Sequence, residues 1–278
     1  MFRNRESWSK RTGRLRSAGR HALTQWPRLS GWIVREAAVL VALFLTSLGI
    51  WFFVELAEEV REGSFQHVDR QMLLMLREAE DPADPLGPRW FEEAARDFTA
   101  LGGVAVLAGL SLAVCGYLLL RRQHDLFLVM ATAAIGALLL NTALKYAFDR
   151  PRPDLVPHGS YVYTRSFPSG HSMMAATIYL TIGVMLTRIQ RQLVVRYYLF
   201  SLCVLTTLLV GASRVYLGVH WPTDVLAGWL AGSAWAAICY LLATWRYRVG
   251  AGRLERVSSE ERAAEIEQAE HSEHLSGS

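Results

Sequence analysis

Hydrophobic residues in this chain fall into six long blocks that are separated by polar and charged segments. A helix needs about 20 mostly apolar residues to cross the hydrocarbon core of a bilayer, and each block approaches that length. The pattern predicts transmembrane helices over approximately 37–56, 101–120, 126–144, 171–187, 193–212 and 225–245. We therefore expect an all-α fold, a bundle of six transmembrane helices.

The polar segments divide the chain into three predicted domains. Residues 1–35 form a basic tail, residues 36–248 form the six-span membrane domain, and residues 249–278 form a charged tail that we expect to be disordered. Within the membrane domain, residues 57–96 form an acidic excursion that carries an apolar stripe. This excursion predicts an external amphipathic segment that lies on the membrane surface or packs on the spans.

Arginine is distributed unevenly over the polar segments, and its distribution predicts the orientation in the membrane. The formal net charge is only +4, but residues 1–35 carry many arginines against a single acidic residue, Glu6. Basic segments also follow the second, fourth and sixth blocks, at 121–122, 188–196 and 246–256. Cytoplasmic loops are enriched in Lys and Arg, so we expect both termini in the cytoplasm. The 57–96 segment then faces the external or periplasmic side of an inner or plasma membrane.

The basic N-terminal segment raises nucleic-acid binding as an alternative. A span follows this segment directly, and attraction to anionic lipid headgroups explains its charge better. We therefore expect the bilayer as its partner, and no nucleic acid. The three cysteines, Cys115, Cys203 and Cys239, lie inside apolar blocks, so they predict neither a disulfide nor a metal site.

The stretch from Ser213 to Asp224 concentrates chemically active side chains at the mouth of an apolar block. His220 and Asp224 are four residues apart, a spacing that on a helix would let the carboxylate hold one ring nitrogen. The other nitrogen would then be unprotonated and able to attack. Pro222 suits the first turn of a helix, which predicts a helix start there. Arg214 offers a planar fork of donors that suits phosphate.

Two other stretches add to this set. Residues 168–171 read Pro-Ser-Gly-His, a turn that offers backbone N–H groups, a hydroxyl and an acid/base group at the start of an apolar block. Positive charge is concentrated at the end of the third block, where Lys145 is followed by Arg150 and Arg152. Basic residues on the external side run against the usual distribution, and binding of an anion would explain them.

Together, the three stretches resemble the signature of the type-2 phosphatidic acid phosphatase family, which shares its site with the vanadium haloperoxidases. The signature reads K-x6-R-P, then P-S-G-H, then S-R-x5-H-x3-D, and every fixed position is present here in order. The resemblance covers residues 145–224. It implies an integral-membrane lipid phosphatase of the bacterial type, with a phosphohistidine intermediate and its site at the non-cytoplasmic membrane face.

The resemblance also implies a role for each motif residue. His220 is the nucleophile, Asp224 orients it, and His171 protonates the leaving group and then activates water. The residues implied to bind phosphate are Lys145, Arg152, Arg214, Ser169 and Gly170. No metal or organic cofactor is implied, and the converging cations argue against a bound divalent ion.

Several alternatives remain open at this stage. The implied substrates are phosphatidate, phosphatidylglycerol phosphate or a polyprenyl diphosphate, and a lipid phosphotransferase would use the same phosphohistidine. The family's haloperoxidases are soluble, which six spans contradict. A non-enzymatic protein that binds or transports lipid headgroups would need the cations but not the histidines and Asp224. Arg150 and Arg165 match no motif position, so we expect them to contact headgroups.

Overall fold

A computed structural model of the chain describes residues 36–37, 39–154 and 165–246. The chain forms two compact units, Met1–Leu45 and Thr46–Ser278. The predicted tails, 1–35 and 249–278, lie outside the described residues, so the division into three domains stays a prediction.

Most of the described residues are helical, which confirms the predicted all-α fold class. The helices are Val39–Glu62, α2 (Gln66–Leu74), α3 (Arg89–Leu101), α4 (Val104–Leu120), α5 (His124–Ala147), α6 (Gly170–Ile189), α7 (Leu193–Tyr216) and Pro222–Arg246. The described part of the chain contains no β-strand, and an isolated bridge pairs Arg77 with Pro85.

Five of these helices are long and apolar enough to cross a membrane, namely Val39–Glu62, α5, α6, α7 and Pro222–Arg246. The predicted second span, 101–120, corresponds to α4, which qualifies only as a pair with α3 that is bent by 46°. The bend lies at Gly102, where an added Cβ would be only 2.3 Å from Cγ1 of Val210. The absence of a side chain therefore lets the bent pair approach α7 closely.

Glycines also let the last helix, Pro222–Arg246, pack closely against α6. A Cβ at Gly228 would lie 2.7 Å from the carbonyl oxygen of Ser169, and a Cβ at Gly232 would lie 2.4 Å from that of Met173. Both distances are shorter than van der Waals contact, so a larger side chain would push the two helices apart. Small residues one turn apart are a common way for membrane helices to pack.

Two tryptophans of the last helix pack against glycines of α7 and α5. The Trp229 ring fills the space that a side chain at Gly211 would occupy, and the Trp235 ring does so at Gly136. Each indole N–H donates a 3.1 Å hydrogen bond to a carbonyl oxygen about one turn before the glycine. Because each ring is both packed and hydrogen-bonded, the last helix has one fixed position between α5, α6 and α7.

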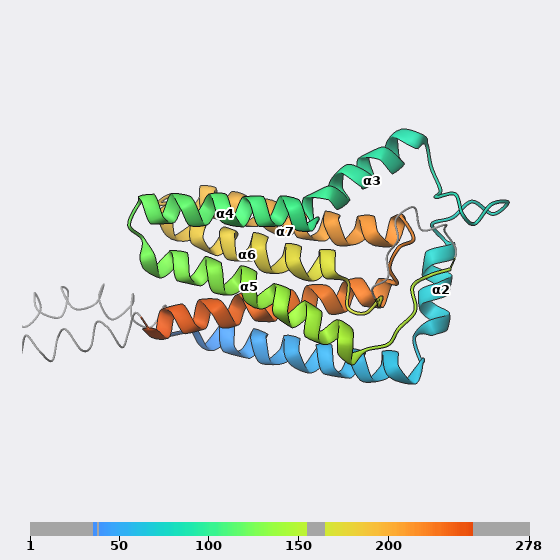
Figure 1. Ribbon diagram of the computed structural model, residues 1–278, viewed down its shortest axis with the longest axis horizontal. Helices are drawn as coiled ribbons and strands as arrows, with labels where there is room; N and C mark the ends of the chain where they lie inside the picture. Colours follow the sequence, from blue (N-terminus) through green and yellow to red (C-terminus); the bar gives the residue numbers. More distant parts are fainter. Residues whose placement is uncertain (1–35, 38, 155–164, 247–278) are drawn as a thin grey trace, which may run out of the picture. The chain divides into compact units, whose positions relative to one another are not determined.

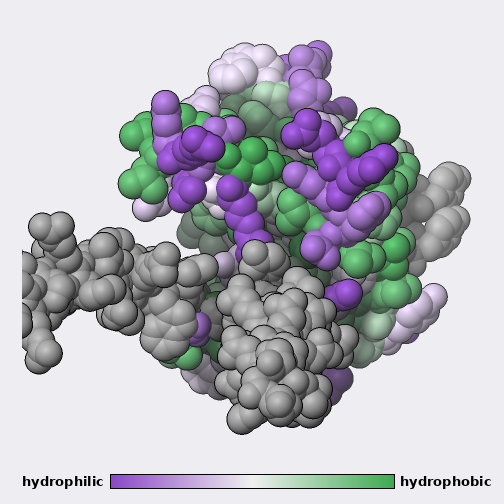
Figure 2. All heavy atoms as spheres, turned by 90° about the vertical axis from the view of Figure 1, so that its left-hand side faces the viewer, coloured by the Kyte–Doolittle hydropathy of each residue, from purple (hydrophilic) through white to green (hydrophobic). Residues whose placement is uncertain are grey.

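Within Thr46–Ser278, one end of the bundle carries α2, and the other end carries two turns with several arginines. Helices α4 to α7 run side by side, and α2 lies at the end where α6 begins and α7 finishes (Figure 1). Figure 2 views the opposite end, where α4 joins α5 and α6 joins α7, and hydrophilic residues gather there. The arginines in these two turns and in the adjoining helix ends are Arg121, Arg122, Arg188, Arg191 and Arg196.

Candidate active site

The three motif stretches meet at the end of the bundle that carries α2 (Figure 1). Lys145 lies in the last turn of α5, Ser169 to His171 begin α6, and Arg214 lies in the last turn of α7. His220 lies two residues before the start of the last helix, and Asp224 lies in the first turn of that helix. The ends of four helices, together with the loop after α5 that carries Arg152, therefore supply the residues that the sequence analysis selects.

His220 and Asp224 contact each other across a helix N-terminus and not along one helix face. The last helix begins at Pro222, as predicted, so His220 lies before it and the expected pairing within a helix is wrong. Oδ2 of Asp224 accepts a 3.1 Å bond from the backbone N–H of Trp221, as the third residue of a helix does in a capping box. Because the Asp224 side chain turns back toward the start of the helix, its Oδ2 lies 3.4 Å from Nδ1 of His220.

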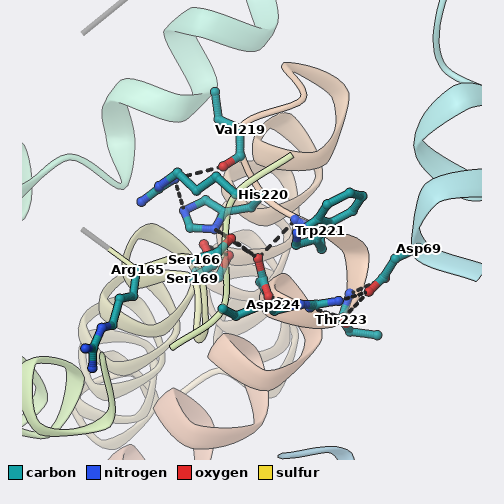
Figure 3. A network of polar contacts seen from close by, with 12 residues as sticks. Asp69, Arg165, Ser166, Ser169, Val219, His220, Trp221, Thr223 and Asp224 are labelled. Atoms are coloured by element: carbon teal, nitrogen blue, oxygen red, sulfur yellow. Dashed lines mark hydrogen bonds and ion pairs between the residues drawn. The ribbon is translucent and has the colours of Figure 1, made fainter. Parts of the chain in front are cut away.

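Several donors hold the buried Asp224 carboxylate in position (Figure 3). Nη1 of Arg150 lies 2.7 Å from Oδ1, and the hydroxyl of Ser166 donates to Oδ2. The Ser166 hydroxyl is also 3.4 Å from Nδ1 of His220. The carboxylate is thus fixed on both oxygens, with Oδ2 on the side of the imidazole.

Arg152 determines which nitrogen of His220 lacks a proton. Nη1 of Arg152 lies 3.0 Å from Nε2 of His220, and a guanidinium only donates, so Nε2 is the acceptor. Nδ1 then carries the proton and faces Asp224. Burial lowers the pKa of His220 to about 4, against the opposing effect of its hydrogen bond with Asp224. A neutral ring with a lone pair on Nε2 is the form that can attack an electrophile.

Three cations converge at the same place. The charges of Arg152 and Arg214 act on Lys145, and the charge of Arg152 acts on Arg214. Nζ of Lys145 lies 2.9 Å from the carbonyl oxygen of Arg165. Nε of Arg214 is buried and has no hydrogen-bond partner among the described residues. Cations this close repel one another, so the arrangement favours an anion with several oxygens.

The N-terminus of α6 belongs to the same site. Ser169 is the N-cap, and its carbonyl oxygen accepts the bond from Met173 N at 3.0 Å. This is the first bond within the helix. The N–H groups of Gly170 and His171 precede Met173 in the chain, so they have no acceptor within the helix. The backbone N–H of Ser169 donates to the carbonyl oxygen of Asp224 at 2.9 Å, which joins α6 to the last helix. Amides at a helix N-terminus suit an anion.

His171 lies near the three cations of the site, Arg214, Arg152 and Lys145. It also lies near His220. Its ring also contacts the break between α3 and α4, since a Cβ at Gly102 would lie 3.4 Å from Cδ2 of His171. The structure therefore brings together all eight residues that the motifs select.

Three residues outside the motifs belong to the site as well. Arg150 does not reach toward headgroups as expected, because its side chain is only 12% exposed and binds Asp224 and Asp69. Asp69 of α2 and Ser166 are both buried. No spacing in the sequence connects these residues to the motifs. Arg165, in contrast, pairs with the exposed Asp149 at 2.9 Å and points away from the imidazole (Figure 3).

A metal site does not fit these side chains. Within 36–37, 39–154 and 165–246, no group of three or more His, Cys, Asp or Glu residues could hold a metal ion. The single carboxylate next to the imidazole is already bound by Arg150, Ser166 and a backbone N–H. The donor set therefore suits an oxyanion better than a cation.

Comparison with known proteins agrees with these features. A family model described as the PAP2 superfamily matches residues 124–248. The phosphatidylglycerophosphatase B of Bacillus subtilis (strain 168) is 33% identical over 199 residues, which are 69% of this chain and 88% of that protein. The undecaprenyl-diphosphatase of Sulfolobus acidocaldarius is 31% identical over 121 residues, which are 42% of this chain and 54% of that protein.

A solved structure is similar in fold. It is the crystal structure of the first transmembrane PAP2 type phosphatidylglycerolphosphate phosphatase from Bacillus subtilis, with a TM-score of 0.62 and 29% identity over 71% of this chain and 94% of that chain. The similarity to this transmembrane protein and the long apolar helices together show that the chain is an integral membrane protein. By its match to the family model and its extended identity with a curated relative, the chain belongs to the PAP2 superfamily.

Proposed function

We propose that this protein hydrolyses a phosphate or diphosphate group of a membrane lipid through a phosphohistidine intermediate. The observation that carries the proposal is the neutral His220, whose Nε2 lies 3.0 Å from Arg152 in a group of cations that includes Lys145 and Arg214. An in-line attack on phosphorus needs a lone pair that points into an anion site, and this arrangement supplies one.

In the first proposed step, Lys145, Arg152 and Arg214 bind the phosphate oxygens and stabilise the negative charge that develops on them. Once Arg152 donates to a phosphate oxygen instead of to His220, the Nε2 lone pair attacks phosphorus, so that a P–N bond forms and the P–O bond to the leaving group breaks. His171 donates a proton to the leaving oxygen. Asp224 stabilises the positive charge that the phosphorylated ring carries.

In the second proposed step, His171 removes a proton from a water molecule, and the water oxygen attacks phosphorus. The P–N bond breaks, its electron pair returns to Nε2 of His220, and inorganic phosphate leaves. The Ser169 hydroxyl and the N–H of Gly170 provide further donors for the phosphate oxygens. Neither step uses a metal ion or an organic cofactor.

The substrate class follows from the position of the site in the fold. The site residues lie at helix ends or in the loops next to them, so a lipid could keep its tail in the bilayer while its headgroup reaches the cations. The relatives support this class, because their names specify a phosphatidylglycerophosphatase and an undecaprenyl-diphosphatase. Phosphatidate, phosphatidylglycerol phosphate and a polyprenyl diphosphate are therefore the substrates that we propose.

We also propose that the site faces the external or periplasmic side of the membrane. The supporting observation is the set of arginines at the opposite end of the bundle, in the turns between α4 and α5 and between α6 and α7. Positively charged turns favour the cytoplasm. With an even number of spans, both termini would then be cytoplasmic.

The test is release of inorganic phosphate from a panel of lipids by the protein purified in detergent. The panel contains phosphatidate, phosphatidylglycerol phosphate and a polyprenyl diphosphate, with glycerol 3-phosphate as a substrate that lacks a tail. We expect hydrolysis of at least one lipid, weaker hydrolysis of glycerol 3-phosphate, and no hydrolysis by the His220→Asn variant. A wild type that releases phosphate from none of them would contradict the proposal.

A phosphotransferase would share the first step but not the second. Reaction in ¹⁸O-labelled water distinguishes the two, since hydrolysis transfers one labelled oxygen to the released phosphate. We expect labelled inorganic phosphate to account for the substrate consumed. Transfer of unlabelled phosphate to an added alcohol, without labelled phosphate, would identify a transferase.

A further inference from the structure

We infer that Arg150 and Asp69 are positioning residues, which hold Asp224 so that it orients the His220 imidazole. This inference rests on the proposed function, because it concerns how the attacking histidine is kept in place. Neither residue occupies a fixed position of the three motifs. We call the set of Asp69, Arg150, Thr223 and Asp224 the Arg150 network.

Arg150 uses both ends of its guanidinium to bind carboxylates. Nη1 lies 2.7 Å from Oδ1 of Asp224, and Nη2 lies 2.6 Å from Oδ2 of Asp69. The guanidinium also lies over the Trp221 ring, 5.6 Å from its centroid. Arg150 therefore has a different task from Arg152, two residues later, which contacts His220 itself.

Asp69 fixes the first turn of the last helix from outside that helix. Its side chain is 1% exposed, and Oδ1 accepts a 3.0 Å bond from the backbone N–H of Thr223. Oδ2 accepts a second bond from the Thr223 hydroxyl. A carboxylate is stabilised at this position, because the N-terminal amides of a helix lack partners within it and carry partial positive charge.

The consequence concerns the rotation of the Asp224 carboxylate. Its last torsion is broad, so the carboxylate needs external partners to keep one oxygen facing Nδ1 of His220. Arg150 binds Oδ1, which leaves Oδ2 at 3.4 Å from Nδ1. Asp69 in turn keeps Arg150 in place, and Thr223 donates to Asp69 while it accepts from Nη1 of Arg150 at 2.7 Å.

If Arg150 and Asp69 had only a structural role, a different experimental result would be expected. Arg150 and Asp69 connect α2 to the last helix, so their loss could simply destabilise the protein. In that case the loss of activity would follow the loss of folded protein and would not depend on Asp224. If they act through Asp224, their effect on the chemical step should disappear once Asp224 is altered.

The experiment measures kcat and KM for Asp69→Asn and Arg150→Gln, each alone and combined with Asp224→Asn, on whichever panel lipid the wild type hydrolyses. We expect each single change to lower kcat about 10- to 100-fold, as for other groups that orient a functional histidine, with KM changed less than about threefold. In the Asp224→Asn background we expect the same changes to lower kcat less than about threefold. Equal losses in both backgrounds would contradict the inference.

Matched controls use charges that lie close by but outside the Arg150 network. Asp149→Asn removes the exposed carboxylate next to Arg150 in sequence, and Arg96→Gln removes an exposed guanidinium of α3 that pairs with Glu92. We expect kcat within about twofold of the wild type for both, since exposed ion pairs contribute little. Losses comparable to that of Arg150→Gln would mean that any change of charge at this end has the same effect.

A milder variant covers the case in which Asp69→Asn or Arg150→Gln does not fold. Thr223→Val removes the hydroxyl that binds both Asp69 and Arg150, whereas Thr223→Ser keeps it. We expect kcat to fall about threefold to tenfold in Thr223→Val and to recover in Thr223→Ser. A Thr223→Val variant with full kcat would contradict the inference.

A readout that does not require activity separates this inference from the proposed function. ¹⁵N spectra of labelled histidine, assigned with His220→Asn, report which ring nitrogen of His220 carries the proton. We expect the Nδ1–H form in both proteins, because Arg152 still donates to Nε2, and a smaller proton chemical shift of Nδ1–H in Thr223→Val, because its hydrogen bond to Asp224 is weaker. If the wild type hydrolyses no lipid, the proposed function fails, and this comparison still tests the network. An unchanged Nδ1–H proton shift in the folded variant would contradict the inference whatever the activity.

Discussion

The guanidinium of Arg152 binds both the His220 ring and the turn that carries it. Nη1 lies 3.0 Å from Nε2 of His220 and 2.8 Å from the carbonyl oxygen of Val219. A phosphate that enters the site would therefore meet Arg152 and the proposed nucleophile at the same point. This geometry leads to separate predictions for the two histidines, for pH, and for metal ions.

The two histidines should differ in their effect on the phosphoenzyme. We expect His220→Asn to abolish both turnover and phosphoenzyme, because no other group replaces Nε2. We expect His171→Asn to form phosphoenzyme from a substrate with a good leaving group and to hydrolyse it slowly, because no base activates water. The measurement is acid-labile, alkali-stable phosphate on the protein after a rapid quench. Label in His220→Asn and none in His171→Asn would reverse the two assignments.

His220 should remain neutral well below the pH at which an ordinary histidine is protonated. Burial lowers its pKa to about 4 from 6.5, so between these values the unfolded chain binds a proton that the folded chain does not. The contribution of His220 to stability therefore falls as pH falls from 6.5 to 4, and it is constant above 6.5. The check is a ¹⁵N titration of His220 in detergent. A midpoint at or above 6.5 would contradict the assigned environment.

Activity should not depend on a divalent metal ion. The Asp224 carboxylate is bound by Arg150, and the proposed anion site consists of Lys145, Arg152 and Arg214. We expect full activity after dialysis against EDTA, and competitive inhibition by vanadate, which resembles the transition state of phosphoryl transfer. Activity that is lost in EDTA and restored by magnesium would show that the site is wrongly assigned.

Single cysteines at the two ends of the bundle should reveal the orientation. Glu80 is exposed in the loop between α2 and α3, and Arg191 is exposed in the turn between α6 and α7. In a chain whose three native cysteines are replaced, we expect Glu80→Cys to react with a membrane-impermeant maleimide in intact cells. We expect Arg191→Cys to react only after lysis. The opposite pattern would place the site on the cytoplasmic side.

The packing of the last helix against α6 should tolerate no added methyl group. A Cβ at Gly232 would lie 2.4 Å from a backbone oxygen of α6, whereas a Cβ at Gly116 in α4 would meet nothing within 4 Å. We expect Gly232→Ala to destabilise the protein by about 1–3 kcal/mol, the usual cost of overpacking. Gly116→Ala should be neutral or slightly stabilising. Thermal unfolding in detergent compares the two, and equal midpoints would contradict this packing.

Much of the fold could be predicted because membrane helices leave a strong local pattern. The apolar blocks end within a few residues of α5, α6 and α7, since the length of a span is set by the bilayer. The sequence does not predict the bend between α3 and α4. Gly102 and Gly103 are equally compatible with a straight helix that packs closely against a neighbour. The spatial neighbour that explains it, Val210, lies far away in the sequence.

The site could be predicted only where its residues follow one another at fixed spacings. His220 and Asp224 were expected to pair, and they do, although their contact crosses a helix start. Arg150 could not be assigned, because its second partner, Asp69, lies 81 residues earlier in a helix without a motif. Burial of this guanidinium depends on how α2 meets the last helix, and no local pattern encodes that contact.

The close contact between the last helix and α6 has a consequence for biosynthesis. The last helix supplies Asp224, and the carbonyl oxygen of Asp224 accepts the bond from Ser169 that joins it to the start of α6. A nascent chain that has inserted only as far as α7 therefore contains Lys145, Arg152, His171 and Arg214 without a carboxylate to orient an attacking imidazole. Enzymatic competence should arise in a single late event, when the translocon releases the final segment into the bilayer.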